Sequence, residues 1–239
     1  MDELSPREKV VARSLLHGFF DPIRLESNSI VWGIAYSLPY VRGRFLDVGC
    51  GAMPYARLVQ DRVSQYIGTD LRPNPGVPPT VVSDSLKLPF RAHTFDTVLC
   101  TQVLEHVRNP FLTLKEIGRV LRPGGHAIMT LPAVWPLHEE PFDFFRYTKY
   151  GLQELAEHSD LHPVTIVERG GGIMAIAQLI GVILYDTLGK HTFTRVPMVA
   201  LVAPFLSIFA ALDRVLFYPK LTLGYTMVAK KIGRSNDSV

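Results

Sequence analysis

The chain has 239 residues, a length at which one domain around a single buried core is the expected arrangement. Hydrophobic residues make up 47% of it and charged residues 20%, which excludes a disordered chain. The net charge of +3 is small and the basic residues are scattered, so we expect no nucleic-acid partner. Because it has only two cysteines and begins without a secretory pattern, we expect a cytoplasmic protein with reduced thiols.

Residues 1–43 are expected to form two helices ahead of the first strand. Ser5, Pro6 and Glu8 have the spacing of a capping box with proline at the first helical position. A second helical stretch covers roughly residues 29–38, and Pro39 ends it.

Short apolar runs alternate with helix-like stretches from Arg44 onward, which indicates a parallel sheet with crossover helices. The prolines in 72–79 predict a loop, and Pro123-Gly124-Gly125 predicts a turn before the next strand. We expect strands at 44–48, 65–69, 80–82, 97–99, 126–131 and 164–168, and helices at 55–61, at 111–120 and after Thr148.

Two long apolar stretches, 173–188 and 196–212, follow Gly170–Gly172 and predict a helical insertion before a last strand at 221–230. The fold class is therefore α/β: a Rossmann-like, mostly parallel, seven-stranded sheet with helices on both faces. We expect one domain, with N-terminal helices (1–43), a cofactor-binding core (44–169), an apolar helical insertion (170–220) and the last strand (221–230).

A cofactor loop is indicated by the apolar strand that ends in Gly49-Cys50-Gly51, where a ligand can approach the backbone closely. Asp70 ends the next apolar run, at the position where such folds use a carboxylate to bind ribose hydroxyls. A dinucleotide is the competing cofactor. The dinucleotide pattern would require glycine at 54, and Pro54 lacks the N–H that a pyrophosphate uses, which disfavours that alternative.

Residues 44–169 resemble the class I S-adenosylmethionine-dependent methyltransferases, specifically the type 11 group. The resemblance is carried by Leu46–Gly51 (LDVGCG), Ser83–Phe90 (SDSLKLPF), Phe95–Val107 (FDTVLCTQVLEHV) and Val120–Gly125 (VLRPGG), in the family's order. It implies S-adenosylmethionine as cofactor and S-adenosylhomocysteine as product. One departure concerns the loop: many relatives have glycine where this chain has Met53.

The resemblance also implies roles for individual residues. Gly49 and Gly51 would approach the methionine moiety, Asp47 would contact its ammonium group, and Asp70 with Leu71 would lie at the ribose. Asp84, Ser85 and Leu86 would read the adenine edge, and Gln102 with Val103 would line the methionine side. For His106, a structural hydrogen bond is favoured over catalysis.

The methyl acceptor is expected at the loop of residues 131–148, which mixes aromatic and ionisable side chains. His138 is the first choice for a general base, with Asp143, Arg146 and Tyr147 as groups that orient the acceptor. Asp143 and Arg146 could equally form a plain ion pair that fixes the loop. His138, Glu139 and Glu140 lack spaced partners, so no metal site is predicted.

The loop is similar to a subset of type 11 enzymes associated with saccharide and lipid-linked glycan modification. We therefore expect transfer to oxygen of a small-molecule or lipid-linked saccharide acceptor. A nicotinamide-dependent reductase and a non-catalytic relative are the alternatives. For residues 173–212, attachment to a membrane surface, a lid, a homodimer interface and an ordinary core helix pair stay open. A bilayer span is disfavoured by Pro197, Pro204 and the charges around Lys190.

Overall fold

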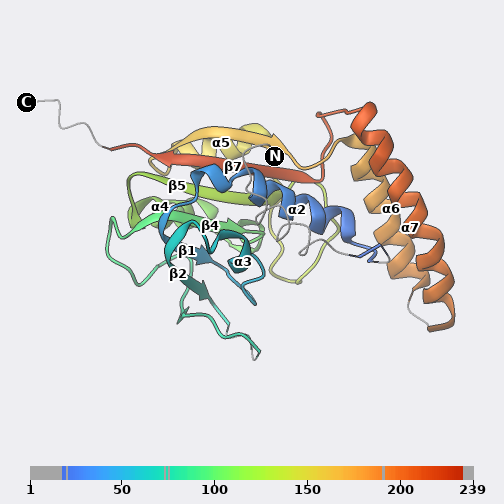
Figure 1. The fold of residues 1–239 in the computed structure, drawn as a ribbon, viewed down its shortest axis with the longest axis horizontal. Helices are drawn as coiled ribbons and strands as arrows, with labels where there is room; N and C mark the ends of the chain where they lie inside the picture. The colour runs from blue at the N-terminus through green and yellow to red at the C-terminus, as the bar shows by residue number, and fades with distance from the viewer. Residues whose placement is uncertain (1–17, 20, 73, 75, 190–191, 234–239) are drawn as a thin grey trace, which may run out of the picture.

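The computed structural model describes residues 18–233 apart from 20, 73, 75, 190 and 191, and shows a seven-stranded sheet with helices on both faces (Figure 1). The strand order is β3-β2-β1-β4-β5-β7-β6, with β7 antiparallel to both of its neighbours. This order confirms the predicted fold class. The helix expected from Ser5 lies outside the described residues. The strands are β1 (Gly43–Val48), β2 (Val63–Asp70), β3 (Val81–Val82), β4 (Phe95–Thr101), β5 (Leu121–Pro132), β6 (Leu161–Glu168) and β7 (Gly224–Lys231).

The central strands are buried on both faces, as expected where crossover helices cover a parallel sheet. On one face, α2 and α3 pack over a cluster that includes Phe45 and Leu99. On the other, α4 and α5 pack over Leu46 and Val98. Alternate residues of one strand thus serve opposite cores. The helices are α2 (Arg24–Tyr36), α3 (Ala56–Val59), α4 (Pro110–Val120), α5 (Lys149–Glu157), α6 (Gly172–Leu188) and α7 (Thr192–Val215), with 3₁₀ turns η1 (Leu38–Tyr40) and η2 (Leu104–His106).

Two local predictions were wrong in their boundaries. Helix α2 begins at Arg24, and Ser29 is inside it, where its hydroxyl donates to the carbonyl of Glu26 and accepts from buried Arg169. Strand β5 begins at Leu121 and includes Pro123-Gly124-Gly125. Phe95 pairs with Leu121 but Thr97 pairs with His126, so these residues form a bulge within the strand rather than a turn before it. Thr148 is confirmed as the N-cap of α5, accepting from Gly151 N.

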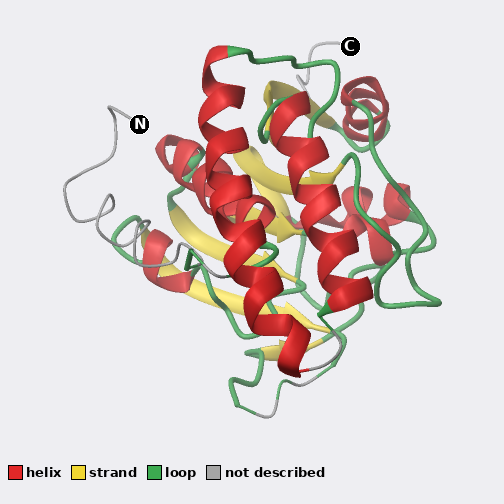
Figure 2. Cartoon of the chain, turned by 90° about the vertical axis from the view of Figure 1, so that its right-hand side faces the viewer, coloured by secondary structure: helices red, strands yellow, loops and turns green. Residues whose placement is uncertain are grey.

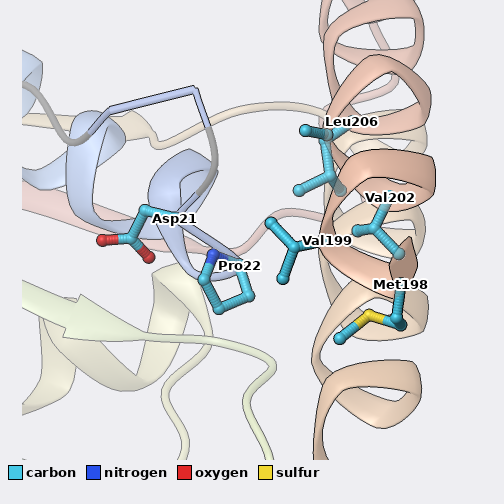
Figure 3. A pocket seen from close by; sticks show the side chains of 7 residues that line it. Asp21, Pro22, Met198, Val199, Val202 and Leu206 are labelled. Atoms are coloured by element: carbon cyan, nitrogen blue, oxygen red, sulfur yellow. The ribbon is translucent and has the colours of Figure 1, made fainter. Parts of the chain in front are cut away.

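Helices α6 and α7 connect β6 to β7 and lie side by side at one end of the molecule, beside the sheet (Figures 1 and 2). Helix α7 continues through both Pro197 and Pro204, so the two prolines do not interrupt this apolar stretch. Hydrogen bonds connect α6 and α7 to α2. Arg24 donates to Ala203 O at 2.6 Å, and Gln178 accepts from Leu25 N. A small recess with mostly apolar lining separates Asp21 and Pro22 from Val199 and neighbouring residues of α7 (Figure 3).

Candidate active site

The glycine loop follows β1 at the point where the strand order reverses, since β2 and β3 lie to one side of β1 and β4 and β5 to the other. Open α/β sheets bind ligands at the carboxyl ends of their strands at this switch point. Gly49 has φ +68°, and a Cβ there would lie 2.3 Å from Cγ2 of Val103, which follows β4. The loop after β1 and the turn after β4 are therefore in contact.

Asp70, at the end of β2, braces the glycine loop. Its Oδ2 accepts from Gly51 N at 2.9 Å, and its Oδ1 accepts from Arg72 N at 3.1 Å. A Cβ added at Gly51 would meet nothing within 4 Å, so the backbone there faces open space. A carboxylate beside an open glycine loop fits a cofactor that presents both hydroxyl and ammonium groups.

Asp47 lies beneath the loop at the end of β1, with 2% of its surface exposed, and the Tyr66 hydroxyl donates to it. Burial raises its pKa to about 7, with the hydrogen bond from Tyr66 opposing the shift and the charge of Asp70 adding to it. A bound ammonium group would compensate this buried carboxylate. Tyr66 was not singled out from the sequence, because its contact depends on the pairing of β1 with β2.

The adenine-side residues form a turn after β3. Asp84 Oδ1 accepts from Leu86 N at 2.9 Å, which fixes the turn, and the side chain of Asp84 is exposed. Ser85 Oγ lies 3.4 Å from Thr113 Oγ1, and Leu71 is exposed. Gln102 has φ +52° and binds Thr130 Oγ1 through its Nε2. All ten predicted cofactor residues belong to loops or strand ends at β1 to β4.

Met53, which stands where many relatives have glycine, adopts a backbone conformation typical of glycine. Met53 has φ +54°, the left-handed conformation that glycine adopts most readily. Met53 N donates to Cys50 O at 2.7 Å, which closes the turn after Gly51. The loop therefore keeps a conformation suited to glycine although a methionine occupies the position.

The four residues predicted for the acceptor side are separated by the structure into two groups. Asp143 forms a two-pronged ion pair with Arg146 and accepts from His138 N. His138 Nδ1 lies 3.2 Å from Asp143 Oδ2, and the side chain of His138 is one third exposed. Tyr147, by contrast, is buried in the core and donates to Leu104 O at 2.8 Å, a placement that gives it a structural role.

Two residues that were not predicted to function lie against this loop. Glu105 is fully buried, and burial raises the pKa of its carboxyl to about 8, opposed in part by an interaction with its own backbone N–H and by the charges of Arg169 and Arg146. His106 Nδ1 lies 2.7 Å from Phe142 O, which confirms the structural hydrogen bond expected for it. The sequence offers one signal for these two residues, since Glu105 and His106 are adjacent ionisable residues shortly after Gln102. Their nearness to His138 could not be predicted, because it depends on the path of the loop after β5.

Comparison with known proteins agrees with this geometry. Residues 46–129 match the model of a family described as a methyltransferase domain. The chain is 29% identical over 100 residues to the ubiquinone biosynthesis O-methyltransferase of Vibrio cholerae, covering 36% of this chain and 41% of that protein. The match thus spans about two fifths of that relative's length.

Two solved structures share the fold. The [4+2]-cyclase SpnF has a TM-score of 0.58 at 19% identity, covering 87% of this chain and 83% of its own. An S-adenosylmethionine-dependent methyltransferase from Archaeoglobus fulgidus has a TM-score of 0.54 at 19% identity, covering 95% of each chain. The glycine loop, its bracing carboxylate and the family match over residues 46–129 agree with one another, and they support a class I S-adenosylmethionine-dependent methyltransferase of the type 11 group.

Proposed function

We propose that this protein transfers the methyl group of S-adenosylmethionine to an oxygen of a small-molecule or lipid-linked saccharide acceptor. The observation that carries the cofactor assignment is the hydrogen bond from Gly51 N to Asp70, made at the switch point of the sheet. Through this hydrogen bond the Asp70 carboxylate would fix the glycine loop, and its remaining lone pairs would accept a hydrogen bond from a ribose hydroxyl.

The bound cofactor would supply a methyl group: a C–O bond forms, the C–S electron pair remains on sulfur, and the acceptor hydroxyl releases its proton. This chain's residues bind and orient. Gly49, Gly51 and Asp47 would hold the methionine end, and Asp84 and its turn the adenine. Such positioning supplies much of the acceleration in a displacement reaction.

His138 is the side chain nearest to a proton-transfer role. Its Nδ1 faces the Asp143 carboxylate and the Pro136 carbonyl, so Nε2 is the nitrogen left for an acceptor. Asp143 and Arg146 position this imidazole rather than touch the acceptor. The similarity to an O-methyltransferase supports oxygen as the atom methylated.

The acceptor loop also contacts the helix pair, which supports an acceptor carried by lipid. Trp135 packs against the apolar cluster of α6 and α7, and Arg146 donates to the Trp135 carbonyl. Among the described residues, one helical segment, Val196–Val215, is long and apolar enough to cross a membrane, and 28% of it is buried. Exposed apolar side chains on the pair include Ile180, Ile183, Val196, Leu201 and Ile208. We propose that this surface rests on a membrane.

The cofactor is tested by calorimetric titration of S-adenosylhomocysteine into the full chain and into Asp70→Ala. We expect micromolar binding by the wild type and at least about tenfold weaker binding by the variant. A folded wild type that binds NADH and not S-adenosylhomocysteine would establish the reductase alternative. Binding of S-adenosylhomocysteine without methyl transfer to any saccharide or lipid-linked saccharide would contradict the proposed acceptor and would favour the non-catalytic alternative.

Membrane attachment is tested by flotation with phospholipid vesicles. Ile180→Glu combined with Leu201→Glu should abolish flotation, because each places a charge on the apolar surface. Phe111→Glu, which places a charge at an exposed apolar position on α4, is the control and should still float. A wild type that stays unbound but sediments as a dimer, dissociated by the double variant, would make the surface a homodimer interface.

A further inference from the structure

A cluster of potential metal ligands lies between the turn after β4 and the loop after β5. Glu105 and His106 come from η2 and His138 from the loop, and their ligand atoms all lie within 4.8 Å of one another. The two imidazole rings meet edge to face, with centroids 4.7 Å apart. Val103, two residues before Glu105, touches the cofactor loop, so the cluster borders the proposed methyl-transfer site.

Glu105 is the informative member of this cluster. It is 0% exposed, and within the described part of the chain neither carboxylate oxygen has a hydrogen-bond partner. A buried carboxyl group without a hydrogen-bond partner is destabilising, and more so when it is ionised. Buried charges in proteins are paired or coordinate metals. A cation beside Glu105 would satisfy both oxygens.

Both histidines are already oriented as metal ligands usually are. His106 Nδ1 lies 2.7 Å from Phe142 O, and His138 Nδ1 lies 3.2 Å from both Pro136 O and Asp143 Oδ2. Ligating histidines typically donate their second ring N–H to a carbonyl or carboxylate, which fixes the tautomer. In each ring Nε2 is then left with its lone pair, and Arg146 holds Asp143 in place.

We propose that Glu105, His106 and His138 bind a divalent first-row transition-metal ion such as Zn²⁺. Two imidazoles with one carboxylate suit these ions better than Mg²⁺ or Ca²⁺, which prefer oxygen ligands. Metal–ligand bonds of about 2.0–2.2 Å require the ligand atoms to lie about 3–4 Å from one another. The ligand atoms of the three side chains would therefore move closer by roughly 1 Å, through side-chain rotation. Three protein ligands leave coordination positions open.

Metal binding at this site does not depend on the proposed function, but a catalytic role for the metal rests on it. If methyl transfer to oxygen is the reaction, an open position would bind the acceptor hydroxyl and lower its pKa, as a metal ion does for bound water. His138 would then act by holding the ion, and no longer as the base. The sequence missed this site because Glu105-His106 and His138 follow different strands.

The test titrates Zn²⁺ by calorimetry, and Co²⁺ by visible absorption, into chelator-treated full-length protein. We expect one ion per chain, with Co²⁺ bands typical of nitrogen and oxygen ligands. Glu105→Gln and His138→Gln should each weaken Zn²⁺ binding by at least about 100-fold, and Asp143→Asn by about 10–100-fold. His158→Gln, which alters an exposed histidine on another surface, should bind as the wild type does.

S-adenosylhomocysteine is also titrated into every variant. Binding as tight as that of the wild type would show that the variant is folded and that its cofactor site is intact. A wild type that binds this ligand but no stoichiometric Zn²⁺ overturns the metal site and leaves the methyltransferase proposal standing. Equal Zn²⁺ affinity in Glu105→Gln also overturns it. Zn²⁺ binding without S-adenosylhomocysteine binding overturns the proposed function alone.

Discussion

Asp143 and Arg146 are joined by two hydrogen bonds, Nη1 to Oδ1 at 2.6 Å and Nη2 to Oδ2 at 2.7 Å. The Asp143 side chain is 1% exposed, and it also accepts from His138 N. Arg146 reaches further to the carbonyls of Trp135 and Pro136. One ion pair thus closes the acceptor loop on itself and orients the imidazole of His138.

Asp143→Asn should lower the free energy of unfolding by about 3 kcal/mol, because it leaves Arg146 without its charged partner in a buried setting. Urea denaturation measures the change. Glu116→Gln is the matched control, since Glu116 pairs with Arg119 in the same two-pronged way but at a more exposed position. There the expected loss is about 1 kcal/mol or less. Equal losses would contradict the burial argument.

Tyr147→Phe should reduce stability by about 1–3 kcal/mol, because it leaves the Leu104 carbonyl without its hydroxyl donor in the core. Affinity for S-adenosylhomocysteine and the KM for the acceptor should not change. Thermal unfolding and steady-state kinetics are measured on the same preparation. A large fall in kcat at unchanged Tm would restore Tyr147 to the acceptor site, where the sequence placed it.

Gly49→Ala should weaken S-adenosylhomocysteine binding by about tenfold or more, because the new methyl group collides with Val103 and moves the loop. It should also lose about 2–3 kcal/mol of stability, from the collision and the positive φ together. Gly124→Ala is the control: Gly124 has φ +76° but open space around it. That variant should lose about 1 kcal/mol and keep its affinity.

Asp96 gives a pH-dependent prediction remote from the site. Burial opposes its ionisation, but hydrogen bonds from Arg44 N and Arg122 prevail and lower its pKa. A carboxyl whose pKa is lower in the folded state contributes stability above its unfolded pKa of about 3.9, and loses it as the pH falls through the folded value.

Asp96→Asn should therefore be less stable than the wild type by about 1–2 kcal/mol at pH 7, and the difference should shrink only below about pH 4. Denaturant unfolding measured from pH 7 to the acid transition tests this. A difference that is already lost between pH 6 and 5 would show that another group controls it.

The sequence by itself determined the sheet and the glycine loop after its first strand. These features depend on neighbours in the chain, because an apolar run that ends in glycines identifies a strand and the turn that follows it. It also placed Asp70 at the end of the strand beside the glycine strand, and there its carboxylate accepts from Gly51 N. Thr148 was identified as a cap because its partner, Gly151, is three residues away.

Only the tertiary structure decided the features that join distant segments. The bulge at Pro123–Gly125 depends on the register of β5 against β4, which no local pattern fixes. Tyr147 became a core residue because the loop folds back onto Leu104. Glu105, His106 and His138 meet because parallel strands β4 and β5 end at the same edge of the sheet, which brings together side chains that are far apart in the chain.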